Sequence, residues 1–213
     1  MKLAVFDFDS TLMDGETLEF LACEFNLQEK IAAITKRAMD GEIDFFESLI
    51  ERVALLKGLE QSKVEKICRE LPLMNGAKEI ISELNKAGFK TVCFSGGFKT
   101  ATTPARHILG LDADFANILH FKNGKMTGLV GGEMMFSSSK GEMLVTLQNL
   151  LGVSPEDTVA VGDGANDLSM FKHAGTRVSF CGKEVLKNAA NVVITEKDLT
   201  KAIQPILQMN GVC

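Results

Sequence analysis

Residues 3–12 read LAVFDFDSTL, a short apolar run that ends in two acids. The six residues from Leu3 to Phe8 fit a buried parallel strand, because polar, turn-prone residues follow them at once. Side chains alternate along a strand, so we expect Asp7 and Asp9 on the same face, with their Cα atoms about 6.6 Å apart. That spacing leaves room for one reacting group or metal ion, although two acids that merely end a strand and face water have the same pattern.

Three further stretches place polar residues where a strand ends or a helix begins. They lie around Ser95, Lys140 and Asp163, far from one another along the chain. In an open α/β sheet the carboxyl ends of the strands converge on one crevice, so all of these stretches are expected to meet the first one there. If these four stretches lie together, Asp7 and Asp9 are better explained as part of a reaction site than as acids that end a strand and face solvent.

The composition indicates a globular protein with a full hydrophobic core. Of the 213 residues, 46% are hydrophobic, enough for one large domain or for one domain with a small insertion. A net charge of -5 argues against nucleic acid as a partner. Five widely spaced cysteines without a CxxC pair indicate reduced thiols, and the sequence has neither a signal-peptide pattern nor a membrane-spanning run. We therefore expect a soluble, cytoplasmic protein that does not bind a membrane.

A helical pattern follows the first strand. Apolar residues recur with a 3.6-residue period in four successive groups, within residues 18–25, 27–38, 46–53 and 64–71. Four short amphipathic helices with no strand between them predict a separate helical subdomain, which we place at residues 14–74. An insertion at this point of the chain would lie over the crevice as a cap.

Helices and strands alternate from Gly76 onward. We expect helices over 77–87, 99–109 and 139–151, strands over 89–94, 158–161, 177–181 and 192–194, and a hairpin over 118–130. The hairpin turn is Asn123-Gly124, and Pro104 makes the second helix begin late or bend. The fold class is therefore α/β: a doubly wound, mostly parallel, Rossmann-like sheet in residues 1–13 and 75–213, with the small helical cap domain inserted.

The predicted crevice is strongly acidic. It collects four carboxylates, those of Asp7, Asp9, Asp163 and Asp167, against one candidate cation, Lys140. Like charges about 4 Å apart repel by about 4 kcal/mol per pair at an effective dielectric of 20, so such a cluster favours a bound divalent cation. Oxygen ligands in this number favour Mg²⁺. Helix capping is the alternative role for either Asp163 or Asp167.

An anion site is predicted beside the acids. Ser95-Gly96-Gly97 offers a hydroxyl and unhindered backbone N–H groups at what reads as a strand-to-helix turn, the geometry that receives a phosphate. Lys140 heads a helix, where a cation opposes the helix dipole unless an anion compensates. The Ser-Gly-Gly turn could be no more than a turn and Lys140 a surface lysine. Taken together, a nucleophilic carboxylate, a second acid, a cation site and an anion cradle describe phosphoryl transfer through an aspartyl-phosphate.

Four motifs in this order match a known family. They are DFDST at residues 7–11, SGG at 95–97, SKGE at 139–142 and GDGAND at 162–167. In these motifs the chain resembles the haloacid dehalogenase-like phosphatases, in particular those that act on O-phospho-L-serine, and the match runs nearly end to end. The resemblance implies an Mg²⁺-dependent phosphatase that takes a small-molecule substrate and forms serine, as a monomer or a homodimer.

The resemblance also implies individual roles. Asp7 would be the nucleophile, and Asp9 would protonate the leaving seryl oxygen and then activate water. Mg²⁺ would be held by Asp7, the backbone carbonyl of Asp9 and Asp163, with Asp167 in support. The phosphate would be held by Ser95, Gly96 and Lys140, and Asn166 would position groups around it. In the cap, Glu16 would pair with the substrate ammonium and Arg52 with its carboxylate, while Met39 and Phe45 would line the pocket.

Less specific readings of the cap residues and of the chemistry stay open. Glu16 could be a first-turn helix acid, Arg52 a solvated residue, and Met39 and Phe45 cap core. A related enzyme would pass the phosphoryl group to another small hydroxyl compound such as homoserine. A receiver-type signalling domain would use phospho-aspartate as a switch, but such domains lack an acid like Asp9 and a helical insertion behind the first strand.

Overall fold

One mixed sheet forms the centre of the molecule in a computed structural model that describes residues 1–39 and 42–212, without the side chain of Met39. Within those ranges seven strands pair in the order β4-β3-β2-β1-β5-β6-β7. Their bounds are β1 (Lys2–Asp7), β2 (Phe89–Phe98), β3 (Ala113–Lys122), β4 (Lys125–Gly132), β5 (Thr158–Gly162), β6 (Thr176–Phe180) and β7 (Val192–Ile194). All neighbours pair in parallel except β3 and β4. The predicted α/β class with a mostly parallel sheet is confirmed.

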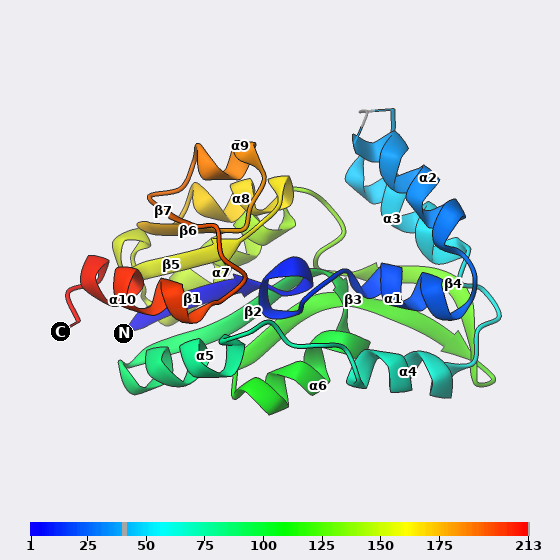
Figure 1. The fold of residues 1–213 in the computed structure, drawn as a ribbon, viewed down its shortest axis with the longest axis horizontal. Helices are drawn as coiled ribbons and strands as arrows, with labels where there is room; N and C mark the ends of the chain where they lie inside the picture. The colour runs from blue at the N-terminus through cyan, green and yellow to red at the C-terminus, as the bar shows by residue number, and fades with distance from the viewer. Residues whose placement is uncertain (40–41, 213) are drawn as a thin grey trace.

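Helices cover both faces of the sheet (Figure 1). One face carries α5 (Ala77–Lys86), α6 (Lys99–Leu109) and α10 (Thr200–Met209), and the other carries α7 (Ser139–Leu151), α8 (Leu168–Phe171) and α9 (Glu184–Lys187). The central strand β1 is buried on both sides, with Ala4 and Phe6 in the first core and Leu3 and Val5 in the second. Alternation along β1 therefore directs Asp7 toward the face that α7 covers.

The topology reverses direction beside β1. From β1 the chain moves outward through β2 and β3, and it later returns to β5 on the other side of β1. Phe6 pairs with Cys93 of β2 and with Val161 of β5, so the carboxyl ends of three neighbouring strands lie at one level. Open α/β sheets bind their ligands at such a switch point. The predicted convergence of the DFDST, SGG and GDGAND segments follows from this arrangement.

The described residues between the turn at Phe8–Leu12 and α5 form the four predicted α-helices: α1 (Thr17–Glu24), α2 (Gln28–Met39), α3 (Phe45–Ala54) and α4 (Gln61–Arg69). Figure 1 shows α2 and α3 rising side by side from the β4 end of the sheet. A capping box begins α3, because the carboxylate of Asp44 accepts the Glu47 N–H at 2.8 Å and that of Glu47 accepts the Asp44 N–H at 3.3 Å. The apolar side chains of α1, α3 and α4 share one continuous core with those of α5 and α6.

Two local expectations have different outcomes. Asn123 and Gly124 form the predicted hairpin turn between β3 and β4, with φ of 53° and 72°, the left-handed values that a type I′ turn requires. The helix that contains Pro104 does not begin late, since α6 starts at Lys99 and runs through the proline. In the parts of the chain that are described, no helix is both long and apolar enough to cross a membrane.

Candidate active site

Asp7 ends β1 at the switch point and is almost fully buried. Its Oδ1 accepts the backbone N–H of Phe8 at 2.6 Å and lies 2.7 Å from the Lys140 ammonium nitrogen. Both contacts use the same oxygen, and the residue lines the large cavity described below. The other oxygen, Oδ2, is therefore the one that a reacting group in the cavity would meet.

Asp9 reaches the same cavity by a different route from the one predicted. The strand ends at Asp7, and residues Phe8–Leu12 form a wide helical turn in which the Met13 N–H donates to the Phe8 carbonyl at 2.9 Å. The argument that strand alternation places both acids on one face is therefore wrong, although both line the cavity. Asp9 is held by Thr17, whose N–H and hydroxyl donate to its Oδ1 at 2.8 and 2.6 Å.

Lys140 joins the acids at the centre of the site. Its ammonium nitrogen lies 2.7 Å from Asp7 Oδ1 and 2.6 Å from Asp167 Oδ1, and it is buried. Burial alone lowers the pKa of this lysine, but the charges of Asp167 and Asp7 outweigh burial and raise the pKa above its usual value. Lys140 is therefore a fixed positive charge next to Asp7, and the alternative that it is a surface lysine is excluded.

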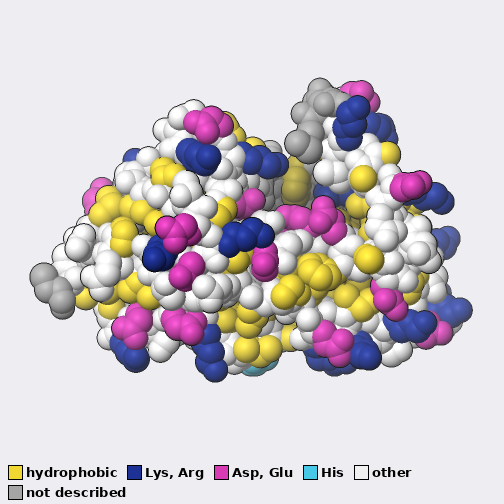
Figure 2. Space-filling view, in the orientation of Figure 1, with side chains coloured by type: hydrophobic (Ala, Val, Ile, Leu, Met, Phe, Trp, Pro, Cys, Tyr) yellow, Lys and Arg dark blue, Asp and Glu magenta, His cyan; other side chains and the backbone are white. Residues whose placement is uncertain are grey.

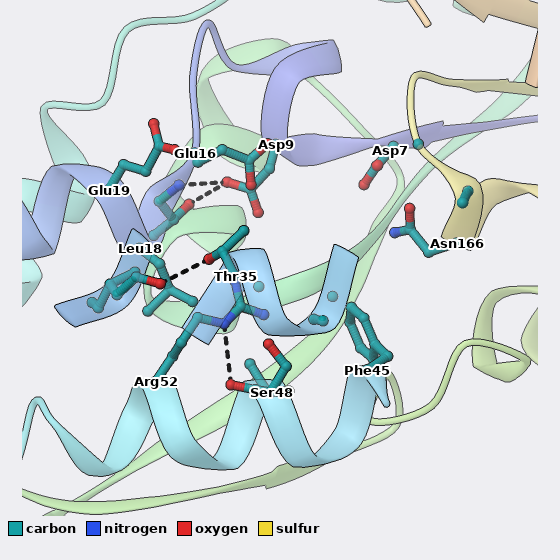
Figure 3. Close-up of a pocket in the computed structure, with 18 of the residues that line it drawn as sticks. Asp7, Asp9, Glu16, Leu18, Glu19, Thr35, Phe45, Ser48, Arg52 and Asn166 are labelled. Atoms are coloured by element: carbon teal, nitrogen blue, oxygen red, sulfur yellow. Dashed lines mark hydrogen bonds between the residues drawn. The ribbon is translucent and has the colours of Figure 1, made fainter. Parts of the chain in front are cut away.

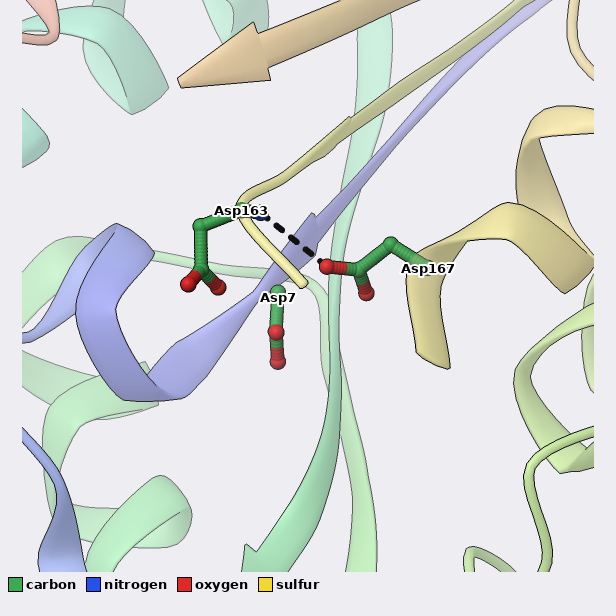
Figure 4. Close-up of side chains that lie close together, drawn as sticks. All are labelled: Asp7, Asp163 and Asp167. Carbon is green, nitrogen blue, oxygen red and sulfur yellow. Dashed lines mark hydrogen bonds between the residues drawn. The ribbon is translucent and has the colours of Figure 1, made fainter. Parts of the chain in front are cut away.

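A carboxylate cluster beside Lys140 fits a hard divalent cation (Figure 4). Asp7, Asp163 and Asp167 each present an oxygen within 4.8 Å of the others. Asp167 Oδ2 also accepts the N–H groups of Asp163 and Gly164, each at 3.0 Å, so this residue holds the loop in place as well. Burial and the charge of Asp167 raise the pKa of Asp163 to about 6, and burial with the same charge raises the pKa of Asp7. A bound cation would offset that repulsion, and oxygen donors of this kind suit Mg²⁺.

The Ser-Gly-Gly segment is a strand rather than the predicted turn. β2 continues through Ser95, Gly96 and Gly97 to Phe98, and its register with β3 shifts between Ser95 and Phe98. Close approach explains the two glycines: a Cβ on Gly96 would lie 2.8 Å from the Phe45 ring, and one on Gly97 would lie 2.7 Å from Asp9 Oδ2. The Gly97 N–H donates to Ser95 Oγ at 2.9 Å, which fixes the serine hydroxyl beside the acids.

A cavity of about 660 Å³ lies between the helices α1, α2 and α3 and the strand ends around Asp7, Gly96 and Asp163, which form its floor. Figure 2 shows the hollow, with acidic side chains at its base. The predicted residues that line it are Asp7, Asp9, Glu16, Phe45, Arg52, Gly96, Asp163 and Asn166. Ser95, Lys140 and Asp167 are buried beneath its floor, next to the residues that line it. The side chain of Met39 lies outside the described residues.

Opposite charges face the cavity from the cap side (Figure 3). Burial and the nearby charge of Asp9 raise the pKa of Glu16 to about 7, and the Ser10 hydroxyl donates to its carboxylate at 2.8 Å. Arg52 lies on α3, where its Nε donates to the Ser48 carbonyl at 3.1 Å and burial lowers its pKa. Among the described residues no ion pair joins Glu16 to Arg52, so each can meet a charge on a ligand.

Several neighbours of the site were missed by sequence reasoning. Thr17 holds Asp9, Lys183 lines the cavity beside Asp163, and Phe136 stacks on Phe46 of α3 with ring centroids 5.2 Å apart. None of the three lies inside one of the four motifs. The apolar run at Met134-Met135-Phe136 was the one available signal: Met134 and Met135 are buried, and Phe136 meets the cap.

Known proteins resemble this chain along almost its whole length. The family profile described as haloacid dehalogenase-like hydrolase matches residues 1–175. A phosphoserine phosphatase of Wolinella succinogenes is 63% identical over 95% of this chain and 98% of its own. A solved phospho-aspartyl intermediate analogue of phosphoserine phosphatase has a TM-score of 0.90 and 46% identity, covering 96% of this chain and 98% of its own. A substrate-bound phosphoserine phosphatase complex, also at a TM-score of 0.90, is 45% identical and covers 96% and 97% of the two chains.

Proposed function

Because this chain belongs to the haloacid dehalogenase-like hydrolases, we propose that it hydrolyses O-phospho-L-serine to L-serine and inorganic phosphate. The observation that carries the proposal is the position of Asp7: a buried carboxylate, held by Lys140 at one oxygen, lines a cavity that Glu16 and Arg52 line as well. Relatives named phosphoserine phosphatase, at up to 63% identity, support it. The reaction is hydrolysis of a phosphoric monoester, in which water is consumed and the alcohol and inorganic phosphate are released.

The first half of the reaction transfers the phosphoryl group to Asp7. Asp7 Oδ2 attacks phosphorus, the bond from phosphorus to the seryl oxygen breaks, and a proton from Asp9 neutralises that oxygen. Burial raises the pKa of Asp9 above its usual range, although the Thr17 hydrogen bonds oppose this, so the carboxyl group is suited to carry a proton. L-Serine leaves, and the phosphoryl group remains on Asp7 as an acyl phosphate, which is a mixed anhydride.

The second half returns Asp7 to its starting state. The Asp9 carboxylate accepts a proton from water while the water oxygen attacks phosphorus, and the bond to Asp7 breaks. Inorganic phosphate then departs. Because Thr17 holds Asp9 at Oδ1, the second oxygen, Oδ2, is the one that exchanges the proton in both halves.

Positive charge and N–H groups stabilise the transferred phosphoryl group. Lys140, the Ser95 hydroxyl and the Gly96 N–H would hold its oxygens, with Asn166 at the side of the cavity. Asp7, the Asp9 carbonyl and Asp163 would hold Mg²⁺, and Asp167 would support them through Lys140 and the loop N–H groups. When bound, Mg²⁺ supplies positive charge against the repulsion between the carboxylate and the phosphate.

Residues 14–74, as a cap, would choose the substrate. Glu16 would pair with the ammonium and Arg52 with the carboxylate of the seryl group, while Phe45 closes over Gly96. The planar guanidinium of Arg52 suits a carboxylate because it can donate two parallel hydrogen bonds. Met39 is proposed to complete the wall. Excluding water from the cavity would protect the acyl phosphate on Asp7 until serine has left.

Assays with and without metal test the function directly. A panel of phosphorylated metabolites is assayed in Mg²⁺, then after removal of the ion by chelator and after its return. We expect O-phospho-L-serine to be hydrolysed fastest, the rate to fall at least about a hundredfold without metal, and Mg²⁺ to restore it. One phosphate released per chain would instead indicate a phospho-aspartate switch, and phosphohomoserine formed when homoserine is added would indicate a phosphotransferase.

Arg52→Ala tests how the substrate is chosen. Loss of a charge-assisted, two-point contact is expected to lower kcat/KM for O-phospho-L-serine about a hundredfold, but kcat/KM for para-nitrophenyl phosphate less than about threefold. Arg37→Ala is the control, because Arg37 lies on cap helix α2 and pairs with Glu42 and Glu51 at the surface. Equal losses on both substrates would remove Arg52 from recognition of the seryl group.

A further inference from the structure

Asn117 is fully buried in β3 and lies outside all four sequence motifs. Its amide nitrogen, Nδ2, donates to the Gly96 carbonyl at 3.1 Å and to the Met134 carbonyl at 3.0 Å, and its Oδ1 accepts the Met134 N–H at 2.9 Å. Both amide protons and the amide oxygen are therefore used. One side chain thus joins the Ser-Gly-Gly segment to the loop that precedes Lys140.

The contact with Gly96 sets the direction of the Ser95 hydroxyl. A trans peptide is planar, and its C=O and N–H groups point in opposite directions. Asn117 holds the Gly96 carbonyl on one side, so the N–H of Gly97 in the same peptide points away from Asn117, where it donates to Ser95 Oγ at 2.9 Å. The serine oxygen already accepts this hydrogen bond, and its own proton is directed to Asp9 Oδ2 at 3.5 Å, the outer limit of a hydrogen bond. A phosphate oxygen in the site would offer this proton a closer acceptor.

The contacts with Met134 fix the other half of the phosphate site. Met134 is buried, and the segment after it leads into α7, whose second residue is Lys140. The Phe136 N–H donates to Ser139 Oγ at 3.1 Å, so the loop is also fixed where the helix begins. A Cβ on Gly132 of β4 would lie 2.8 Å from the Asn117 Cα, which shows how closely β4 packs on this residue.

We propose that Asn117 is a positioning residue for the phosphate site, which keeps the Ser95 hydroxyl and the Lys140 ammonium in the arrangement that one phosphate group needs. The proposal rests on the proposed phosphatase function. Asn117 does not line the cavity, so it acts through the Gly96–Gly97 peptide and the Met134 backbone rather than by touching the substrate.

Asn117→Asp separates this role from general stability. The carboxylate keeps an acceptor for the Met134 N–H but turns an oxygen toward the carbonyls of Gly96 and Met134, which repel it. Gln148→Glu is the matched control: this buried amide also donates two hydrogen bonds, to the Thr158 hydroxyl at 2.9 Å and the His173 carbonyl at 2.8 Å, and it too does not line the cavity. The melting temperature of each variant is measured with its kinetics.

The readout is inhibition by the two products, with para-nitrophenyl phosphate as substrate. In Asn117→Asp we expect the Ki for inorganic phosphate to rise about tenfold to a hundredfold, because small displacements of binding groups have effects of this size. The Ki for L-serine should stay within about twofold, because its contacts lie in the cap. Both constants should remain close to wild type in Gln148→Glu at a similar loss of melting temperature.

Two results would overturn the positioning role. One is an unchanged Ki for inorganic phosphate in Asn117→Asp; the other is an equal rise in both Ki values, which a general loosening of the fold would produce. If the aspartate variant does not fold, Asn117→Ser is measured in its place, since serine is too short for the same contacts and carries no charge. Wild-type protein that hydrolyses the aryl phosphate but not O-phospho-L-serine would contradict the proposed substrate and leave this test intact.

Discussion

Asp7→Asn is expected to reduce hydrolysis of O-phospho-L-serine by at least about ten-thousand-fold, because an amide oxygen is too weak a nucleophile to form the acyl phosphate. The fold should persist. Asparagine keeps an oxygen that can accept the Phe8 N–H and face Lys140, as Asp7 Oδ1 does at 2.6 and 2.7 Å. Burial and the charge of Asp167 raise the pKa of Asp7, which means that the folded protein disfavours the charged form of this residue. Asparagine carries no charge and Lys140 keeps Asp167 as its partner at 2.6 Å, so the melting temperature should be equal to or above that of the wild type.

Phosphate release, measured beside thermal unfolding, checks both halves of this expectation. Asp14→Asn serves as the control, because the same change is made seven residues later, where the carboxylate pairs with Lys197 at 2.6 Å on the surface. That variant should retain wild-type activity. Rates near those of the wild type in Asp7→Asn would end the assignment of the nucleophile, and an unfolded Asp7→Asn protein would contradict the stability argument.

The meeting of the acids and Lys140 at one end of the sheet was predictable, because these residues obey a topological rule. Once the run before Asp7 is read as a central parallel strand, the acids and polar residues at other strand ends must converge beside it. Asp7, Asp163 and Lys140 do so. The fold class followed from the same alternation of helices and strands.

The errors occur where tertiary contacts decide the local backbone. Strand alternation could not place Asp9, because the chain leaves the sheet immediately after Asp7 and makes a wide helical turn. The glycines of Ser95-Gly96-Gly97 read as a turn, yet they serve close approach to Phe45 and Asp9, which lie far away in the sequence. Sequence patterns of period two or 3.6 contain no information about such contacts.

Asn117 and Thr17 show a further limit. Each is a polar residue within or beside an otherwise regular element, and each acts through hydrogen bonds to a partner in another segment: Asn117 to Gly96 and Met134, Thr17 to Asp9. A single sequence gives no sign of those partners. Buried polar side chains with all of their hydrogen bonds made inside the protein are visible only in three dimensions.

Lys140→Met is the second substitution from which we expect a large effect, on both stability and rate. Lys140 is the ammonium group that contacts Asp7 and Asp167, at 2.7 and 2.6 Å, and methionine fills much of its volume without the charge. Removing one partner from a buried ion pair costs about 3–5 kcal/mol, because the remaining charges are left buried and unpaired. Loss of a charge that stabilises the transferred phosphoryl group should lower kcat by at least about a thousandfold.

The dependence of unfolding on Mg²⁺ gives this prediction a distinctive signature. In the wild type, Lys140 already offsets part of the repulsion among Asp7, Asp163 and Asp167, whose oxygens lie within 4.8 Å of one another. Without it, a divalent cation has more repulsion to relieve, so adding Mg²⁺ should raise the melting temperature of Lys140→Met by more than it raises that of the wild type. Lys172→Met, at an exposed lysine, should respond as the wild type does. A Lys140→Met protein whose stability is indifferent to Mg²⁺ would mean that the three carboxylates do not act together as one cation site.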